Sequence, residues 1–219
     1  MTQTRPDLAY TLSVLSRFNH NPSLQHIKAA KRMLRYIQGT KLLGITYTGH
    51  PSGTLDIQVY SDSDYAGDLE TRRSTTGYMI YMAGGPTIWK SNRQKAVTLS
   101  STEAEYYALS SVAKEAAWIR HFLLEISYFG PDIEPILVNR DNQGSLALAE
   151  NPQYHQKTKY IDIQYHYIRQ ELKAGHVTLH YLPTELMPAD GLTKPLTKEK
   201  HLNFLRLLKL TSWYTPAVK

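Results

Sequence analysis

The spacing of the apolar residues changes abruptly along this chain, and the change restricts the folds open to it. Between residues 6 and 38, apolar side chains recur every three or four residues, which predicts helices with a break at 19–22. From about residue 42 the period becomes two, and residues 55–60 alternate apolar and polar side chains as a strand does. The order predicts a mixed α/β domain behind a helical segment.

The rest of the chain continues this pattern. Further strands are expected at 78–82, 87–90, 96–99, 136–138 and 176–182, and helices at 103–126, 143–149, 162–174 and 198–208. Ser100 and Thr102 each stand three residues before a glutamate, which is the spacing of a capping box at a helix start. We therefore expect a helical segment over 1–50, an α/β domain over 51–210 and a loose tail over 211–219.

Composition removes several classes of site. The 219 residues include no cysteine, which excludes a disulfide scaffold, a cysteine-ligated zinc site and a thiol nucleophile. No apolar run approaches the roughly 18 residues of a membrane span, and the first residues lack a secretory pattern, so no membrane partner is expected. Lys and Arg outnumber Asp and Glu by 25 to 19, which permits a polyanionic partner.

Two aspartates stand where predicted strands end. Asp62 closes the strand that begins near residue 55, and Asp141 follows the apolar strand 136–138 closely. The ends of neighbouring strands meet at one edge of an α/β sheet, where ligand sites commonly form. These two carboxylates are therefore candidates for one site.

The long predicted helix adds a third candidate. At 100° per residue, Glu105 lies on the axis of an apolar stripe that contains Leu109, Val112, Ala116, Ile119 and Leu123. Glu103 lies about 160° away, on the polar side. A buried carboxylate needs a partner, and a cation is the natural one. Oxygen ligands suit Mg²⁺ or Mn²⁺, and two such ions about 4 Å apart support phosphodiester hydrolysis.

Several motifs resemble those of one family. Residues 61–68, 73–78, 99–106, 141–143 and 189–195 resemble the ribonuclease H region of copia-type retrotransposon Pol polyproteins. Residues 4–10, 15–18 and 29–36 resemble the segment that joins the reverse transcriptase to that region. The resemblance covers roughly residues 4–210. It implies a ribonuclease H-like fold, with a five-stranded mixed sheet flanked by helices.

The resemblance also implies the site residues. The catalytic, metal-binding set carried over by motif is Asp62, Glu105, Asp141 and Asp190, which would hold two Mg²⁺ (or Mn²⁺) ions. Asp64 competes with Asp62, and Glu103 with Glu105. His155 is the candidate for a histidine that assists product release, with His166 as the alternative. Candidate nucleic-acid contacts are Arg73, Ser74, Asn142 and Gln143.

Two positions depart from the family pattern. Tyr160 replaces a histidine, and Gly191 replaces a larger apolar residue beside Asp190, where glycine would loosen the loop.

The implied activity is metal-dependent hydrolysis of the RNA strand of an RNA–DNA hybrid. The reverse transcriptase portion of the same polyprotein would be its partner, in a cytoplasmic virus-like particle or in the nucleus. No Tyr-x-Asp-Asp motif occurs, so polymerase chemistry is not expected from these residues. The alternatives are a catalytically silent nucleic-acid-binding module or relic, and an integrase-type strand transferase, whose carboxylate set fits less well.

Overall fold

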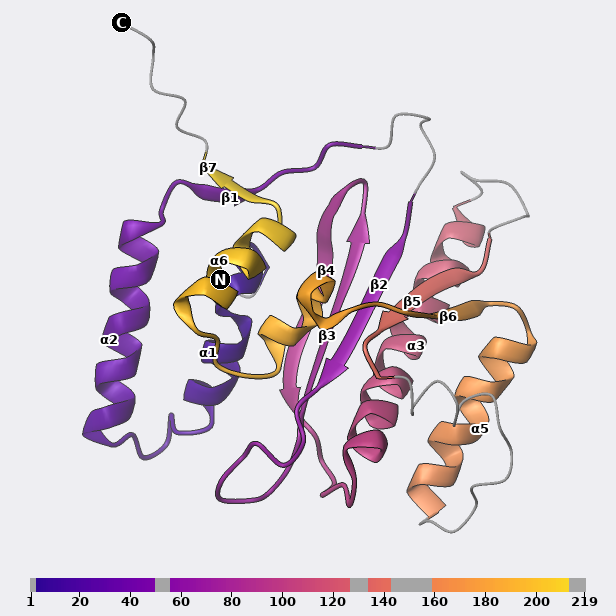
Figure 1. Cartoon of the computed structure of the whole chain (residues 1–219), viewed down its shortest axis with the longest axis horizontal. Helices are drawn as coiled ribbons and strands as arrows, with labels where there is room; N and C mark the ends of the chain where they lie inside the picture. Colours follow the sequence, from indigo (N-terminus) through magenta and orange to yellow (C-terminus); the bar gives the residue numbers. More distant parts are fainter. Residues whose placement is uncertain (1–2, 50–55, 127–133, 143–158, 213–219) are drawn as a thin grey trace, which may run out of the picture.

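The computed structural model describes residues 3–49, 56–126, 134–142 and 159–212. A five-stranded sheet lies at its centre (Figure 1), built from β2 (Gln58–Ser63), β3 (Thr75–Met82), β4 (Gly85–Arg93), β5 (Ile136–Arg140) and β6 (Val177–Tyr181). The strand order is β4-β3-β2-β5-β6. The first three strands are antiparallel, whereas β2, β5 and β6 run parallel. The predicted mixed sheet flanked by helices, a ribonuclease H-like arrangement, is confirmed.

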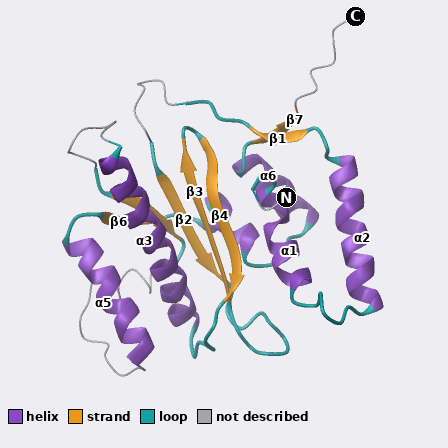
Figure 2. Cartoon of the chain, turned by 180° about the vertical axis from the view of Figure 1, so that it is seen from behind, coloured by secondary structure: helices purple, strands orange, loops and turns teal. Residues whose placement is uncertain are grey.

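Helices cover both faces of the sheet (Figure 2). On one face lies α3 (Ser101–Glu125), with α5 (Lys159–Lys173) packed against it. On the other face lie α1 (Ala9–Ser16), the short helix η3 (Pro188–Leu192) and α6 (Lys198–Leu207). Each face therefore has its own apolar core.

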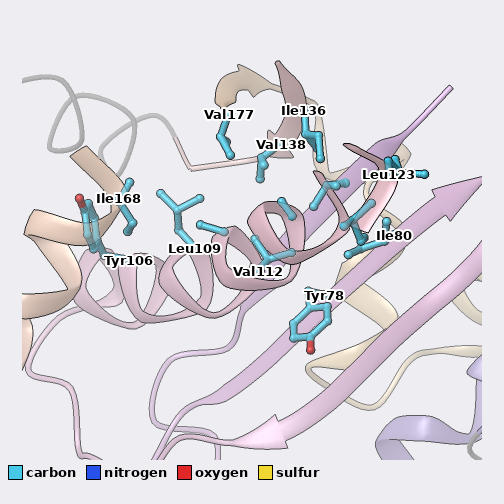
Figure 3. Packing of buried hydrophobic residues seen from close by; sticks show 14 residues of the cluster. Tyr78, Ile80, Tyr106, Leu109, Val112, Leu123, Ile136, Val138, Ile168 and Val177 are labelled. Carbon is cyan, nitrogen blue, oxygen red and sulfur yellow. The ribbon is translucent and has the colours of Figure 1, made fainter. Parts of the chain in front are cut away.

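The central strand β3 shows how the two cores divide. Tyr78 and Ile80 belong to the core under α3, and Met79 and Tyr81 belong to the core under α6. Successive side chains of a strand point to opposite faces, so a strand covered on both sides is apolar throughout. Figure 3 shows Leu109 and Val112 of α3 in the first core, which also contains Ile80.

The first 50 residues are joined to the end of the chain. They form η1 (Pro6–Leu8), α1, α2 (Leu24–Gly39) and β1 (Leu43–Ile45), and β1 pairs antiparallel with β7 (Leu210–Ser212). Arg5 donates two hydrogen bonds to Asp7, at 2.9 and 2.7 Å, and the Tyr36 hydroxyl donates a third at 2.7 Å. Strand β7 takes in residues 211 and 212, the start of the expected tail. The division of the chain at residues 50 and 210 stays a prediction.

The predicted strand at 96–99 is wrong. These residues form the connection from β4 to α3, and Val97 and Leu99 are 50% and 79% exposed. The apolar residues there resemble a strand in sequence, but none of the described strands pairs with them. Ser100 caps α3 as expected, because its hydroxyl accepts from the Glu103 amide at 3.2 Å. The predicted helix 143–149 lies outside the described residues.

Among the described helices, none is long and apolar enough to cross a membrane.

Candidate active site

Three carboxylates from three elements converge at one edge of the sheet. Asp62 comes from β2, Glu105 from the first turns of α3, and Asp141 from the residue after β5. One oxygen of each lies within 4.8 Å of the others. Strands β2 and β5 are parallel neighbours, so their carboxyl ends meet at this edge. The site opens into a hollow of about 480 Å³, lined by Asp62, Ser63, Glu105, Asp141, Asn142, Tyr181 and Lys194.

Each carboxylate is held by a hydrogen-bond donor from another part of the fold. The Thr193 hydroxyl donates to Asp62 Oδ2 at 2.6 Å. The Ser63 amide donates to Glu105 Oε1 at 3.1 Å. The Thr184 hydroxyl donates to Asp141 Oδ2 at 2.8 Å. The carboxylates are thus oriented by the protein itself, as ligand groups of a metal site usually are.

Negative charge dominates the cluster, although the Arg140 guanidinium is paired with Glu105. Burial raises the pKa of Asp62 well above its ordinary value, and the nearby Glu105 charge raises it further, while the Thr193 bond opposes the shift. Burial also raises the pKa of Glu105, against the opposing effect of Arg140. Oxygen donors alone, crowded and desolvated, make a donor set that fits a hard divalent cation such as Mg²⁺ or Mn²⁺.

Arg140 is a member of the site that the sequence pattern did not predict. This last residue of β5 is fully buried, and its Nη2 donates to the main-chain oxygen of Glu105 at 2.8 Å and to Oε2 at 3.1 Å. The sequence feature that could have indicated this role is the position of the arginine, directly before Asp141 at the end of an apolar strand.

Asp190 lies close to the cluster without joining it. The residue is on η3 and is 7% exposed, but among the described residues only Asp62, Glu105 and Asp141 bring their oxygens together. The Lys194 ammonium forms an ion pair with Asp190 Oδ1. Although burial opposes it, the partner carboxylate of Asp190 raises the pKa of Lys194. The fourth predicted carboxylate is therefore already paired with a cation of the chain.

Two glycines allow the Asp190 loop to pack closely, Gly77 against the sheet and Gly191 against α6. A Cβ at Gly77 of β3 would meet the Thr193 methyl group at 2.7 Å and the Ala189 carbonyl at 2.8 Å. A Cβ at Gly191 would meet the Phe204 ring at 2.7 Å. Gly191 is therefore a close-packing residue inside η3, and the expected loosening of the loop is not observed.

Gly191→Ala should destabilise the protein. Phe204 is 4% exposed and its ring would lie 2.7 Å from the added methyl group, which therefore overpacks the core at a cost of about 1–3 kcal/mol. Thermal unfolding measures the loss. Gly39→Ala is the comparison, because Gly39 has no positive φ and no atom within 4 Å of a Cβ. A Gly191→Ala variant as stable as the wild type would contradict this packing.

The structure separates the two pairs of competing acids. Asp64 accepts a hydrogen bond from the Thr75 amide in the turn after β2, away from the three-carboxylate cluster. The Glu103 carboxylate turns back and accepts from the Leu99 amide at 2.8 Å. Glu103 is nevertheless only 6% exposed, because the connection from β4 covers it. The roles of these residues stay predictions.

The other predicted site residues fall in different places. Asn142 lines the hollow, and Arg73 lines a separate groove beside β4. His155 and Gln143 lie outside the described residues, and His166 is exposed on α5. Ser74 is fully buried, and its hydroxyl accepts from the Ala66 amide at 3.1 Å and bonds Thr98 at 3.0 Å. These bonds organise the β2–β3 connection, and the predicted contact of Ser74 with a nucleic acid stays a prediction.

Comparison with curated proteins identifies relatives along nearly the whole chain. It is 38% identical over 208 residues to the retrovirus-related Pol polyprotein from transposon RE1 of Arabidopsis thaliana, which covers 95% of this chain and 14% of that protein. It is 38% identical over 200 residues to the corresponding polyprotein from transposon TNT 1-94 of Nicotiana tabacum, covering 91% and 15%. It is also 49% identical over 119 residues to secreted RxLR effector protein 161 of Plasmopara viticola, covering 54% and 82%.

Among solved structures, LC11-RNase H1, isolated from compost by a metagenomic approach, is 18% identical, with a TM-score of 0.48 over 63% of this chain and 92% of that one. No protein-family model matches the chain. The two transposon proteins are far longer than the chain, which spans 14% and 15% of their lengths. By these similarities the chain belongs to the retrovirus-related Pol polyproteins of copia-type transposons.

Proposed function

We propose that this chain is a ribonuclease H that hydrolyses the RNA strand of an RNA–DNA hybrid during reverse transcription of a retrotransposon. The observation that carries the proposal is the oxygen-only cluster of Asp62, Glu105 and Asp141 at the edge of the sheet. Membership of the Pol polyprotein family supports a nucleic acid as substrate. Two divalent cations, Mg²⁺ or Mn²⁺, are the proposed cofactors, and the reverse transcriptase portion of the polyprotein is the proposed partner.

The residues of the chain would each perform a definite task. Asp62, Glu105 and Asp141 would hold the cations, and Asp190 would become available to one of them when the Lys194 ammonium leaves its Oδ1. Bound divalent cations lower the pKa of an attacking water and stabilise the leaving 3′-oxygen. Thr193, Thr184 and the Ser63 amide keep the carboxylates oriented. The freed Lys194 would face the phosphate from the wall of the hollow.

A basic groove near the cluster supports a polyanionic substrate. The groove lies between α1 and β4, has a volume of about 640 Å³, and is lined in part by Arg17, Arg73, Lys90, Arg93 and Lys95. Arg17 and Arg93 share Asp68 at 2.9 and 2.8 Å. The strand register sets Ser91 opposite Gly77 and Gly77 opposite Asp62. Ser91, which lines the groove, is therefore two strand spacings, about 10 Å, from Asp62. One bound duplex could contact both the groove and the carboxylate cluster.

Removing two lysines of the groove should weaken hybrid binding. Lys90 and Lys95 are exposed and lie on the rim. With both changed to alanine, the slope of log affinity against log salt should fall by about one for each lost phosphate contact. Fluorescence anisotropy of a labelled hybrid in EDTA, between about 50 and 200 mM salt, measures this without cleavage. Lys198→Ala with Lys200→Ala, exposed on α6, is the control. Equal slopes in both double variants would contradict the groove's role.

The substrate class is tested with a panel of labelled duplexes. Hybrid, RNA–RNA and DNA–DNA duplexes of one sequence are incubated with the chain and Mg²⁺. Cleavage of the RNA strand of the hybrid alone is the expected result, because the 2′-hydroxyl distinguishes that strand from DNA. Cleavage of the DNA duplex at a similar rate would assign a different nuclease activity.

A second candidate function is a nucleic-acid-holding module without hydrolysis. It is favoured by one observation: Glu105 and Asp190 already have cationic partners within the chain, Arg140 and Lys194. Hybrid binding with no divalent-cation binding would support this candidate.

A further inference from the structure

Arg140 is buried to a degree that is rare for a charged residue. It is 0% exposed, and its Nε and Nη1 have no hydrogen-bond partner in the described part of the chain. Strand β5 pairs with β2 on one side and β6 on the other, so the backbone that carries Arg140 is fixed. Burying a guanidinium is costly unless a specific partner compensates it. Its only ion-pair partner among the described residues is Glu105.

The contacts of Arg140 determine how the Glu105 carboxylate lies. Nη2 bonds both the main-chain oxygen and Oε2 of Glu105, which ties the first turns of α3 to the end of β5. The Ser63 amide holds the other oxygen, Oε1, from β2. A carboxylate has about four lone-pair positions, so two donors leave positions on both oxygens for a further ligand. The carboxylate is therefore clamped from two strands while it still lines the hollow.

We propose that Arg140 is a positioning residue, which fixes the Glu105 carboxylate in the orientation that receives a divalent cation. The proposal rests on the proposed function, because it assigns Glu105 to a cation. Arg140 acts only through Glu105 and touches neither substrate nor metal. Groups that orient metal ligands in this way typically contribute 10- to 100-fold to metal affinity.

The test measures binding of Mn²⁺ to the full chain by electron paramagnetic resonance, which needs no catalysis. Arg140→Lys keeps the charge but replaces the planar fork by a single ammonium, which cannot reproduce the same pair of bonds. We expect its Mn²⁺ affinity to fall about 10-fold. Arg206→Lys is the matched control, since Arg206 is exposed on α6 and its side chain donates to Asn203, far from the carboxylate cluster in the fold. Its Mn²⁺ affinity should be unchanged.

Repeating the measurement in a Glu105→Gln variant distinguishes a role in positioning Glu105 from a role in supporting the fold. In a Glu105→Gln background, Arg140→Lys should change Mn²⁺ affinity less than about twofold, because the group through which Arg140 acts is gone. An equal loss in both backgrounds would show that Arg140 supports the fold rather than Glu105, and would overturn the proposal. Circular dichroism and thermal unfolding verify that each variant is folded.

Should Arg140→Lys fail to fold, Arg140→Met combined with Glu105→Gln removes both buried charges together. This double variant should fold and bind Mn²⁺ as Glu105→Gln alone does, and a clear difference in affinity would overturn the proposal. Unchanged Mn²⁺ affinity in folded Arg140→Lys would overturn this proposal and leave the proposed function standing. A wild-type chain that binds no Mn²⁺ would overturn both.

Discussion

Asp62→Asn should lower the rate of hybrid cleavage by at least about three orders of magnitude. The asparagine keeps the shape of the side chain and can still accept from Thr193, but it removes a negative charge from the centre of the three-carboxylate cluster. A neutral amide is a poor ligand for a hard cation. Single-turnover cleavage of a labelled hybrid at saturating Mg²⁺ measures the loss.

The same variant should not unfold. Burial and Glu105 raise the pKa of Asp62, so the ionised carboxylate is unfavourable in the cation-free protein and its removal should not lower the unfolding free energy. Thermal unfolding in EDTA checks this. Asp64→Asn is the comparison, because Asp64 lies outside the cluster. Full activity in Asp62→Asn with a dead Asp64→Asn would transfer the role to Asp64.

Glu105→Gln should stop cleavage at saturating Mg²⁺, whereas Glu103→Gln should leave it near normal. Glu105 is one of the three converging carboxylates, and its oxygens are oriented by Ser63 and Arg140. Partial activity with Mn²⁺ is expected for Glu105→Gln, because Mn²⁺ accepts less ideal ligands. Cleavage rates in Mg²⁺ and in Mn²⁺ measure both effects.

Glu103 serves as the matched control for Glu105, two residues away on the same helix. Its carboxylate accepts from the Leu99 amide at the start of α3, and a glutamine oxygen can still accept there. The expected cost is about 0.3–1 kcal/mol, from the lost charge near the helix N-terminus. Circular dichroism confirms folding of both variants. An inactive Glu103→Gln with an active Glu105→Gln would move the site to the other side of α3.

Local pattern predicted much of the sheet and the convergence of three acids. The helical phase put Glu105 on the buried face because the apolar stripe that contains Leu109 and Leu123 fixes which face meets the sheet. Asp62 and Asp141 were placed together because strand ends share an edge. Both expectations depend on the repeat of a single element and on one rule of sheet geometry.

What sequence did not reveal depends on contacts between distant segments. The helical phase placed Glu103 on the polar side of α3, but the connection from β4 covers this residue. The angular positions of residues on one helix contain no information about such a connection. In the sequence Arg140 is an ordinary residue at the end of a strand, and its role becomes visible only from its hydrogen bond to Glu105 of α3. The sequence suggested that Gly191 loosens its loop, whereas in the structure Gly191 packs against the Phe204 ring of α6. In each case the deciding neighbour comes from another element.

The proposed ribonuclease H activity is tested by incubating an end-labelled RNA–DNA hybrid with the purified chain, in Mg²⁺ and in EDTA, and measuring cleavage of the RNA strand. The chain is in excess over the hybrid, and Asp62→Asn is run beside it. We expect products with a 5′-phosphate in Mg²⁺, none in EDTA and none with the variant. An intact RNA strand in Mg²⁺, from a folded chain that binds both the hybrid and Mn²⁺, would contradict it.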